Sequence, residues 1–461
     1  MKTKKNILII GAGLCGSLLA LRLGQRGYKV QVIEKRPDIR QSNLSTGRSI
    51  NLALSNRGLK ALQMVGLKDK VKSISIPMYG RMLHDKIGNK KMSKYSGRNG
   101  EYINSISREL LTSLLIDEAE LINNVNFEFN QNCWDIDFEN NIAYFKNDKN
   151  NRTTEFKADL IFGTDGAGSI LRKNYLSKNK FLFNFSQSFL GHGYKELTIP
   201  SNDGKHRIEK NALHIWPRGS FMIIALPNLD GSFTVTLFLS YNNGHYNFNN
   251  LTTKENIHNF FLEEFPDALE LMPNLTEDFL KNPTGPLGTI KCFPWQYKGK
   301  NMILGDASHA IVPFYGQGMN ASFEDVFELD KTLTENNENW ESTFKYFENS
   351  RKLNTDAIAD LAIDNFHEMK DHVADKNFQQ KRNLEMKLES KLPGKYFSKY
   401  SLVTFREDIG YFEAMSQGRA QDKCILKMIK NKSTDLNLPE KELNKIIQKK
   451  SNHILKKLNY E

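Results

Sequence analysis

The chain has 461 residues and 39% hydrophobic content, enough to build the core of one large domain or of roughly two to three ordinary ones. Its formal net charge of +11 would attract anionic ligands, but no recognition motif accompanies the dispersed lysines, so nucleic acid is not expected as a partner. Four widely spaced cysteines form no metal-ligand pattern and no apolar run reaches about eighteen residues, which predicts a soluble cytoplasmic protein without a metal site or a transmembrane anchor.

The N-terminal segment carries a dinucleotide-binding pattern. Residues 6–10 form a short apolar run that enters glycines directly, which is typical of a buried parallel strand and unlike a signal peptide. The glycines of the following G-x-G-x-x-G motif, which open a helical pattern, are Gly11, Gly13 and Gly16. A second strand over residues 29–33 ends in Glu34, whose carboxylate can accept hydrogen bonds from both ribose hydroxyls of an adenosine. The combination predicts FAD or NAD, and not a 2′-phosphorylated dinucleotide.

Residues 77–85 have the alternation of a β-strand, with Arg81 on a face that is otherwise apolar. A guanidinium is a planar fork of donors, so in a shielded pocket it would suit the carboxylate of an amino acid. An edge-strand arginine with its head in solvent is an equally good interpretation of this pattern alone. Further strand patterns over residues 213–227 and 233–239 indicate that this strand belongs to a second, antiparallel sheet that covers the cofactor.

Two later strands distinguish FAD from NAD. Residues 159–164 form a buried strand followed by Asp165, and residues 302–304 form another that leads into Asp306. Because the carboxyl ends of parallel strands meet at one edge of a sheet, these acids and the glycine motif should converge on one extended ligand, which favours FAD. Small residues at 316–320 then precede a helical pattern, whose N-terminus would favour the negative charge of a reduced flavin.

Two helical patterns follow toward the C-terminus. In the first, Asn365 lies on the same apolar stripe as Leu361, so its side chain points inward, either to bond backbone in the core or to bind a ligand. The second has a narrow apolar stripe among lysines, formed by Leu443, Ile446, Ile447, Ile454 and Leu458. That stripe favours a docked or fraying surface helix over a helix that lies on a membrane.

The order of the motifs, G-x-G-x-x-G, then D-G at residues 165–166, then G-D at residues 305–306, resembles that of the single-component FAD-dependent aromatic hydroxylases. Longer blocks resemble the branch of this family that hydroxylates kynurenine, and they span the chain from residue 5 to about residue 410. The blocks are GRSINLALSNRGLKAL at 47–62, IPMYGRMLH at 76–84, YINSISREL at 102–110, LHIWPRGSFMIIALPN at 213–228 and GDASHAIVPFYGQGMNASFEDV at 305–326.

The resemblance implies an α/β fold with a Rossmann-like FAD-binding domain of the aromatic hydroxylase type, an antiparallel β-sheet substrate domain and a helical C-terminal region. The FAD-binding domain is expected to be discontinuous, over residues 1–75, 101–183 and 285–335. The substrate-binding domain is expected over residues 76–100 and 184–284, and the helical region over residues 336–461.

The resemblance also implies a non-covalent FAD. NADPH would act as a transient reductant, since the chain has no second G-x-G-x-x-G motif and so no separate nicotinamide domain. Asp306 would bind the ribityl hydroxyls of FAD, and Gly318 would bring a helix N-terminus against the flavin ring, which Pro313 and Phe314 would wall. The other cofactor contacts carried over by matching position are Cys15, Ile33, Lys35, Arg36, Ala53, Arg108, Cys133, Asp165, Ile170, Met319 and Asn320.

The implied activity is hydroxylation of L-kynurenine to 3-hydroxykynurenine with NADPH and O2, in tryptophan degradation toward quinolinate and NAD. The implied substrate contacts are Arg81, Tyr95, Asn365 and Tyr400, with Phe238 and Phe314 on either side of the aromatic ring. Two alternatives stay open, namely a related flavin hydroxylase acting on another amino-aromatic acid and an FAD-binding redox protein without catalysis. The chain could act as a monomer or as a homodimer.

Overall fold

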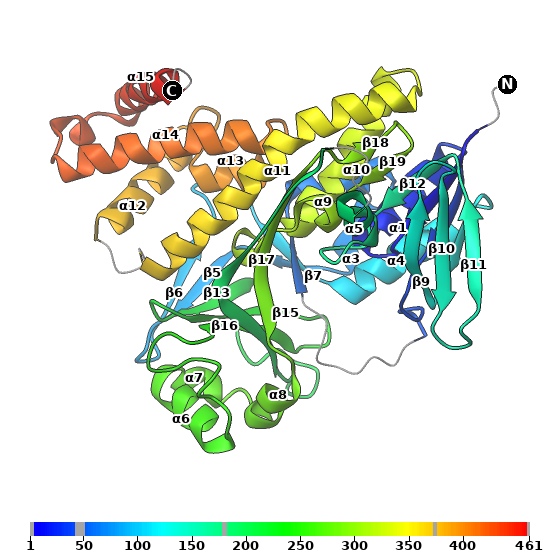
Figure 1. The fold of residues 1–461 in the computed structure, drawn as a ribbon. Coiled ribbons are helices and arrows are strands. Elements are labelled where there is room, and N and C mark those ends of the chain that lie inside the picture. The colour runs from blue at the N-terminus through cyan, green and yellow to red at the C-terminus, as the bar shows by residue number, and fades with distance from the viewer. Residues whose placement is uncertain (1–3, 42–50, 178–181, 372–375, 459–461) are drawn as a thin grey trace. The chain divides into compact units, whose positions relative to one another are not determined.

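The computed structural model describes residues 4–41, 51–177, 182–371 and 376–458 (Figure 1). The sequence block that starts at Gly47 is therefore described from residue 51 onward. The chain divides into two compact units. Unit 1 comprises Met1–Ser75, Ile106–Phe189 and Gly288–Ala359, and unit 2 comprises Ile76–Ser105, Leu190–Leu287 and Asp360–Glu461. Residues 336–461, expected as one helical region, are divided between the units, because the first part of the long helix α11 (Trp340–Asp371) clusters with unit 1.

Unit 1 is built on a six-stranded sheet in the order β18, β19, β12, β1, β2, β8. Its strands are β1 (Asn6–Ile10), β2 (Lys29–Ile33), β8 (Val125–Glu128), β12 (Leu160–Gly163), β18 (Gln296–Tyr297) and β19 (Asn301–Ile303). All neighbours run parallel except β18, and Ile10 at the end of β1 lies opposite both Ile33 and Gly163. The carboxyl ends of β1, β2, β12 and β19 are therefore adjacent, which confirms that the predicted motifs follow neighbouring strands.

Helices and a smaller sheet complete unit 1. The helices are α1 (Leu14–Gln25), α2 (Asn56–Met64), α3 (Lys68–Ser73), α4 (Arg108–Glu120), α5 (Ile170–Ser177), α9 (Asp306–His309) and α10 (Gly318–Glu335). The small antiparallel sheet consists of β9 (Gln131–Asp137), β10 (Ile142–Asn147) and β11 (Thr153–Lys157). Helix α1 packs against α4 and α10 and is buried along most of its length, so the glycine motif at its start is held by the core of the unit.

Unit 2 is built on a seven-stranded sheet in the order β17, β13, β16, β15, β14, β5, β6. The strands of this sheet are β5 (Gly80–His84), β6 (Lys90–Lys94), β13 (Asn184–Ile199), β14 (Ala212–Pro217), β15 (Met222–Pro227), β16 (Phe233–Ser240) and β17 (Gly285–Phe293). Residues 184–189 of β13 and 288–293 of β17 belong to unit 1. From β13 to β6 the neighbours are antiparallel, except that β14 and β5 run parallel. One pair of the expected antiparallel sheet is thus parallel, since a long connection joins β5 to β14.

The two faces of this sheet have different roles. One face packs against α6 (Lys254–Glu264), α7 (Pro266–Leu269) and α8 (Leu275–Lys281), which lie together on one side of the strands in Figure 1. Trp216, Ile223 and Leu237 belong to the core formed there. Side chains alternate along a strand and laterally paired residues share a face, so the opposite face carries Arg81, Leu213, Met222 and Phe238.

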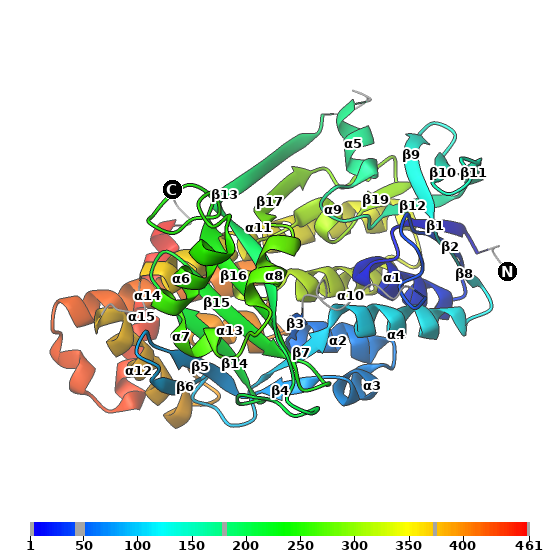
Figure 2. The ribbon, with the colours of Figure 1, turned by 90° about the horizontal axis from the view of Figure 1, so that it is seen from below.

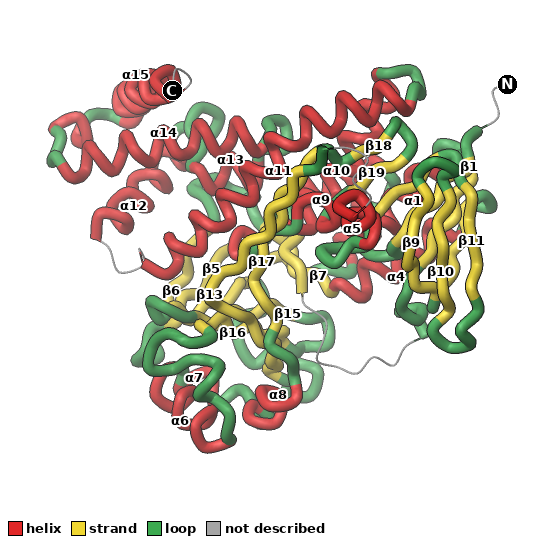
Figure 3. Tube along the Cα trace, in the orientation of Figure 1, coloured by secondary structure: helices red, strands yellow, loops and turns green. Residues whose placement is uncertain are grey.

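The part of unit 2 after residue 360 is helical (Figure 3). Its helices after α11 are α12 (Lys376–Lys391), α13 (Lys399–Phe405), α14 (Tyr411–Lys430) and α15 (Glu440–Leu458). Leu443 and Ile447 of α15 are buried against Leu388 and Ile425, which supports the interpretation of α15 as a docked helix; the Leu458 side chain lies outside the described residues. Within the described part of the chain, every helix is too short or too polar to cross a lipid bilayer.

A pair of buried histidines lies on the helix-covered face of the unit 2 sheet. His84 Nδ1 is 2.8 Å from Asp267 Oδ2, and His84 Nε2 is 2.8 Å from His214 Nδ1. His214 Nε2 lies 2.8 Å from the carbonyl oxygen of Glu209, and burial lowers the pKa of His214 from 6.5 to about 4. The unfolded chain therefore takes up this proton at a higher pH than the folded protein does, so the associated stability is present above pH 6.5 and is lost as the pH falls toward 4.

Replacing His214 should flatten the pH dependence of stability. When the pH is lowered from about 7 to about 4.5, protonation of His214 should reduce the unfolding free energy of the wild type by roughly 2–3 kcal/mol. This part of the decrease should be absent in His214→Gln. Denaturant unfolding of both proteins at the two pH values measures the difference. The variant starts from a lower stability at neutral pH, because it also loses the bond to His84, so the slope with pH is the informative quantity. Equal slopes would contradict the assignment.

Candidate active site

The glycine loop after β1 has the geometry of a phosphate-binding turn. Gly11 has φ +105°, and a Cβ there would lie 2.8 Å from the Thr164 carbonyl oxygen. A Cβ on Gly16 would lie 2.0 Å from the Gly11 carbonyl oxygen, so helix and strand can approach only with glycine at both positions. A Cβ on Gly13 would meet no described heavy atom within 4 Å. The loop is thus packed on its inner side and open at Gly13, the N-cap of α1, where a pyrophosphate would approach.

Glu34 is fixed beside this loop at the end of β2. Its Oε2 accepts a hydrogen bond from Ala12 N–H at 2.9 Å, and its Oε1 accepts one from Arg36 N–H at 3.0 Å. The two neighbouring positions differ from each other, since Ile33 is buried whereas Lys35 is exposed. The carboxylate is half-buried and anchored through backbone N–H groups, and each oxygen keeps a second lone pair for a ribose hydroxyl.

Asp165, directly after β12, has one buried carboxylate oxygen without a hydrogen-bond donor among the described residues. Its Oδ2 accepts from the N–H of Ile170, the first residue of α5, at 2.6 Å. Its Oδ1 is buried and has no hydrogen-bond partner among the described residues, and burial raises the pKa of Asp165. Burial and the nearby charge of Asp165 raise the pKa of the Cys133 thiol on β9. Cys133 is therefore close enough to Asp165 to feel its charge. Buried polar atoms are nearly always bonded, so the orphan oxygen indicates a ligand hydroxyl.

The G-D turn after β19 packs onto the glycine helix. Gly305 has φ +60°, and a Cβ there would lie 3.1 Å from both the Cys15 sulfur and the Ser322 hydroxyl oxygen. Cys15 is buried, and its thiol lies 3.7 Å from the Ser322 carbonyl oxygen. Asp306, the first residue of α9, is exposed. The turn therefore presents the Asp306 carboxylate outward from the same edge of the sheet as the glycine loop.

The segment before α10 is tied to strand β3 (Asn51–Leu54) by Asn320. The Asn320 side-chain amide donates to the carbonyl oxygens of Ala53 at 2.8 Å and Gly316 at 2.9 Å, and its oxygen accepts from Ser55 N–H at 2.9 Å. Asn320 thus shapes the loop through backbone bonds. Gln317, the N-cap of α10, makes no side-chain cap bond, so the first N–H groups of α10, at Gly318 and Met319, are left for a ligand.

The remaining cofactor predictions have varied surroundings. Pro313 is exposed and Phe314 is buried at 9% exposure, both in the short 3-10 turn Pro313–Tyr315. Arg108 is exposed at the first position of α4, where Ser107 caps the helix. Arg36 is exposed next to Glu34. The structure therefore gathers Gly11, Gly13, Glu34, Asp165, Cys15 and Asp306 around one sheet edge, whereas among the described residues no hydrogen bond or ion pair joins Arg108 to that group.

A buried ionic network beneath the G-D turn escaped the sequence analysis. Asp325 Oδ2 accepts from Gly305 N–H at 3.0 Å and lies 2.6 Å from His309 Nε2, while Arg351 binds the other oxygen at 2.8 Å. Arg351 also donates to Glu324 at 2.8 Å, which in turn accepts from Arg57 at 2.6 Å. Burial opposes the charge on Asp325, but His309 and Arg351 outweigh it and lower the pKa of Asp325. The acid pair at 324–325 in the quoted block was the available signal.

The substrate residues predicted in unit 2 do come together. The Arg81 guanidinium lies 5.4 Å from the Tyr95 ring centroid and 4.5 Å from that of Tyr400. The two tyrosine rings are stacked, with centroids 5.7 Å apart and an interplanar angle of 12°. Tyr95 is 1% exposed, and its hydroxyl has no hydrogen-bond partner in the described structure. Burial and the neighbouring Tyr400 raise the pKa of Tyr95, so this hydroxyl stays a donor beside a cation.

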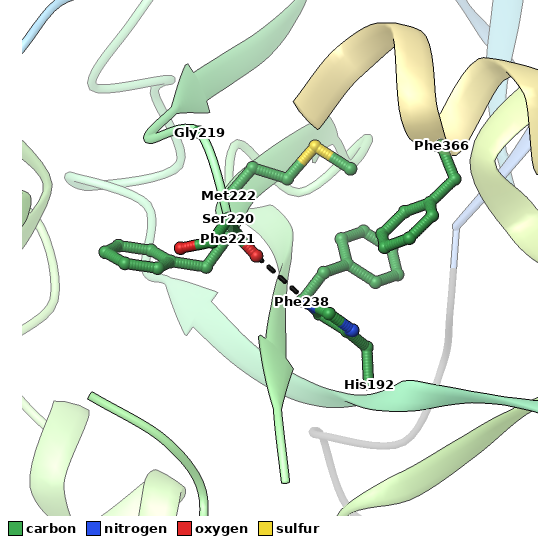
Figure 4. A pocket seen from close by; sticks show the side chains of 7 residues that line it. All are labelled: His192, Gly219, Ser220, Phe221, Met222, Phe238 and Phe366. Atoms are coloured by element: carbon green, nitrogen blue, oxygen red, sulfur yellow. Dashed lines mark hydrogen bonds between the residues drawn. The ribbon is translucent and has the colours of Figure 1, made fainter. Parts of the chain in front are cut away.

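A small aromatic hollow lies on the same sheet face as Arg81 (Figure 4). Its lining residues are His192, Gly219, Ser220, Phe221, Met222, Phe238 and Phe366. His192 Nε2 lies 3.1 Å from the Ser220 carbonyl oxygen, and its ring is 5.1 Å from that of Phe366, edge to face. Asn365, half-buried, immediately precedes Phe366 on α11. Sequence analysis missed His192, Met222 and Phe366. Met222 is paired with Phe238 on the neighbouring strand, so the alternation of side chains along both strands was a signal that could have put it on the same face.

Comparison with known proteins defines the class first. Residues 4–181 and 287–359 match the family described as "FAD binding domain", so the protein is an FAD-binding protein. Among solved structures, 2-methyl-3-hydroxypyridine-5-carboxylic acid oxygenase matches with a TM-score of 0.65 at 20% identity, over 86% of this chain and 99% of its own, which shows the aromatic hydroxylase fold.

Closer relatives define the particular family. A kynurenine 3-monooxygenase of Flavobacterium johnsoniae is 45% identical over 97% of this chain and 99% of its own length. One of Dictyostelium discoideum is 44% identical, over 95% of this chain and 96% of its own length. The chain belongs to the kynurenine 3-monooxygenase family.

Proposed function

We propose that the protein is an FAD-dependent monooxygenase that hydroxylates L-kynurenine to 3-hydroxykynurenine with NADPH and O2. The observation that carries the substrate assignment is the Arg81, Tyr95 and Tyr400 cluster. The Arg81 guanidinium lies beside the stacked rings of Tyr95 and Tyr400, and the buried Tyr95 hydroxyl has no hydrogen-bond partner among the described residues, so the cluster offers two kinds of donor. That arrangement is complementary to a carboxylate. The aromatic hollow on the same sheet face suits the aryl group of the same ligand. We assign the cofactor to unit 1 and the substrate to unit 2.

The residues of unit 1 fit FAD. Gly11, Gly13 and Gly16 would hold the pyrophosphate and Glu34 the adenosine ribose, while the orphan Asp165 oxygen and the exposed Asp306 carboxylate would take hydroxyl groups. When bound, FAD would accept electrons from NADPH and would supply the chemistry that transfers one oxygen atom from O2 to the aromatic ring. The N-terminus of α10 would stabilise negative charge on the ring system by roughly 0.5–2 kcal/mol.

The residues of unit 2 would position the substrate and exclude water. Arg81 and Tyr95 would bind its carboxylate, and Tyr400 and Asn365 would lie at its amino end. Phe238 and Met222 would enclose the ring, because both are buried side chains of the same sheet face. The substrate's own aniline nitrogen activates the ortho carbon, so no protein acid or nucleophile is required and catalysis depends on orientation.

The test is NADPH consumption and product mass with purified, FAD-loaded protein. We expect L-kynurenine to accelerate NADPH loss at least about tenfold and to yield a product one oxygen atom heavier. Acceleration by anthranilate or a hydroxybenzoate but not by kynurenine would instead identify a hydroxylase of another aromatic acid. A yellow protein whose NADPH consumption responds to none of them would be an FAD-binding redox protein. Repeating the assay with NADH measures the nicotinamide preference.

We also propose a cytoplasmic location. All four cysteines are free and buried, which suits a reducing compartment. Monomer and homodimer are both compatible with the proposed chemistry, and light scattering of the FAD-loaded protein distinguishes them.

A further inference from the structure

One buried carboxylate, Glu389 of α12, contacts the chain segments that carry both tyrosines of the substrate cluster. Its Oε2 accepts from Gly97 N–H at 2.9 Å, two residues after Tyr95. Its Oε1 accepts from Ser398 N–H at 2.9 Å and from the Ser401 hydroxyl at 2.6 Å, on either side of Tyr400. Glu389 is 0% exposed. It therefore joins two segments that are about three hundred residues apart in the sequence.

The approach of α12 to the Tyr95 segment is close and specific. A Cβ on Gly97 would lie 2.1 Å from the Met386 carbonyl oxygen, so the backbone there is pressed against the helix. Arg382 donates to the carbonyl oxygens of Lys94 at 2.9 Å and Tyr95 at 2.8 Å. Positions 382, 386 and 389 lie on one face of a helix. Their bonds show that this face meets the segment after β6 that carries Tyr95, and α12 and β6 lie in the same part of the molecule in Figure 2.

The groups that form the described hydrogen bonds to Glu389 are all donors, and the charge of Glu385, one turn earlier on α12, acts on it as well. Besides the bonds from Gly97, Ser398 and Ser401, Arg98 donates to Oε1 at 3.2 Å. Burial alone would raise the pKa of Glu389, but these donors outweigh it and lower the pKa, so the side chain stays a carboxylate. An amide at this position would direct its NH2 group at a backbone N–H whichever way it turned. The site thus requires a charged, two-oxygen acceptor.

We infer that Glu389, with Arg382, is a positioning residue that sets the spacing of Tyr95 and Tyr400 around Arg81, and so the affinity for the substrate carboxylate. The inference rests on the proposed function, because it gives the cluster a carboxylate ligand. Neither residue touches that ligand. They act by holding the Tyr95 hydroxyl and the Tyr400 ring in place, through backbone bonds on both segments. The C-terminal helices thereby serve the substrate site and not only the fold.

The test compares binding of L-kynurenine with binding of its decarboxylated amine analogue. In Glu389→Gln we expect the kynurenine dissociation constant to rise about 10- to 50-fold, that of the analogue to change less than about threefold, and kcat and FAD content to stay near wild type. The unfolding midpoint should fall in either case, because the amide meets a buried N–H group, but a purely structural role would weaken both ligands equally. Arg382→Gln, at a partly exposed side chain, should shift kynurenine binding several-fold in the same direction, and it serves if Glu389→Gln does not fold.

Glu385→Gln is the matched control on the same helix. Glu385 is also buried; its carboxylate lies 3.5 Å from Lys381 and 4.0 Å from Arg382, and none of the described bonds joins it to Gly97 or Ser398. Arg382 keeps its shorter bonds to the Lys94 and Tyr95 carbonyl oxygens in this variant. Burial raises the pKa of Glu385 to about 7, so glutamine resembles its neutral form and kynurenine binding should stay within about twofold of wild type. If the ratio of the dissociation constants for kynurenine and its decarboxylated analogue is unchanged in both Glu389→Gln and Arg382→Gln, this inference is wrong and the proposed function still stands. A wild type that does not bind kynurenine would overturn the proposed function, and the inference with it.

Discussion

Replacing Arg81 by alanine is expected to raise the KM for L-kynurenine about 30- to 5000-fold while the FAD content stays unchanged. The guanidinium is the cation next to the buried Tyr95 hydroxyl and the Tyr400 ring. Truncating one partner of a shielded charge pair costs roughly 2–5 kcal/mol, which corresponds to that range. Steady-state kinetics and the quenching of flavin fluorescence by substrate measure the effect. The residues proposed to hold the cofactor are all in unit 1, whereas Arg81 is in unit 2, so flavin binding should be preserved.

Two further variants separate charge from geometry at this site. Arg81→Lys keeps the charge but loses the planar fork, so its KM should lie between those of the wild type and the alanine variant. Lys91→Ala removes one positive charge from the neighbouring strand β6, where Lys91 is exposed opposite Leu83. Its KM should match the wild type if the effect of Arg81 is local. Unchanged kinetics in Arg81→Ala would place Arg81 outside the substrate site.

The parts of the fold that sequence analysis predicted well depend on local rules. The strands expected at 6–10 and 29–33 are observed as Asn6–Ile10 and Lys29–Ile33, and the strand expected at 159–164 is observed as Leu160–Gly163. Apolar runs of that length that end in glycine or an acid have few alternatives in a parallel sheet. Gly11 and Gly16 were identifiable for the same reason, because the tight turn and the close helix approach exclude a side chain there.

The supporting residues could not be predicted, because their partners are distant in the sequence. Glu389 lies in a helix that reads as polar and solvated, yet it is fully buried and bonds the Tyr95 and Tyr400 segments. Asp325 was quoted within a motif, but its partner Arg351 lies outside that motif. His192 carries no local signal beyond its place on a strand. Burial of such groups depends on tertiary contacts, and charge periodicity alone does not distinguish a buried acid from a solvated one.

Dependence on tertiary contacts also explains why the parallel pairing of β5 and β14 in the unit 2 sheet was not predicted. Strand alternation predicts that residues 77–85 and 213–217 are strands with a buried face, but it does not predict whether the two strands run parallel or antiparallel to each other. The observed register, with Arg81 beside Leu213, puts the arginine on the face of Met222 and Phe238. A shift by one residue would have turned Arg81 toward the helix-covered face. The proposed substrate site therefore depends on a register that only the structure shows.

Asp306→Ala is expected to yield a folded protein without bound FAD. The Asp306 carboxylate is exposed at the first position of α9, so its removal leaves the core of the G-D turn intact. Gly305 stays anchored through its N–H bond to Asp325 at 3.0 Å. Each lost bond between a carboxylate and a flavin hydroxyl is worth roughly 1.5–3 kcal/mol, so FAD affinity should fall about 10- to 150-fold for each bond lost. The ratio of flavin absorbance to protein after gel filtration measures the loss.

Stability and charge controls make this result specific to the cofactor. The unfolding free energy of the apoprotein should change by no more than about 0.5 kcal/mol in Asp306→Ala, since an exposed side chain away from the core is removed. Glu335→Ala deletes an exposed acid at the last residue of α10 and should keep its FAD, which would exclude a general effect of net charge. An Asp306→Ala protein that purifies yellow would show that the G-D turn does not hold the flavin. A colourless and unfolded one would show that Asp306 supports the turn itself.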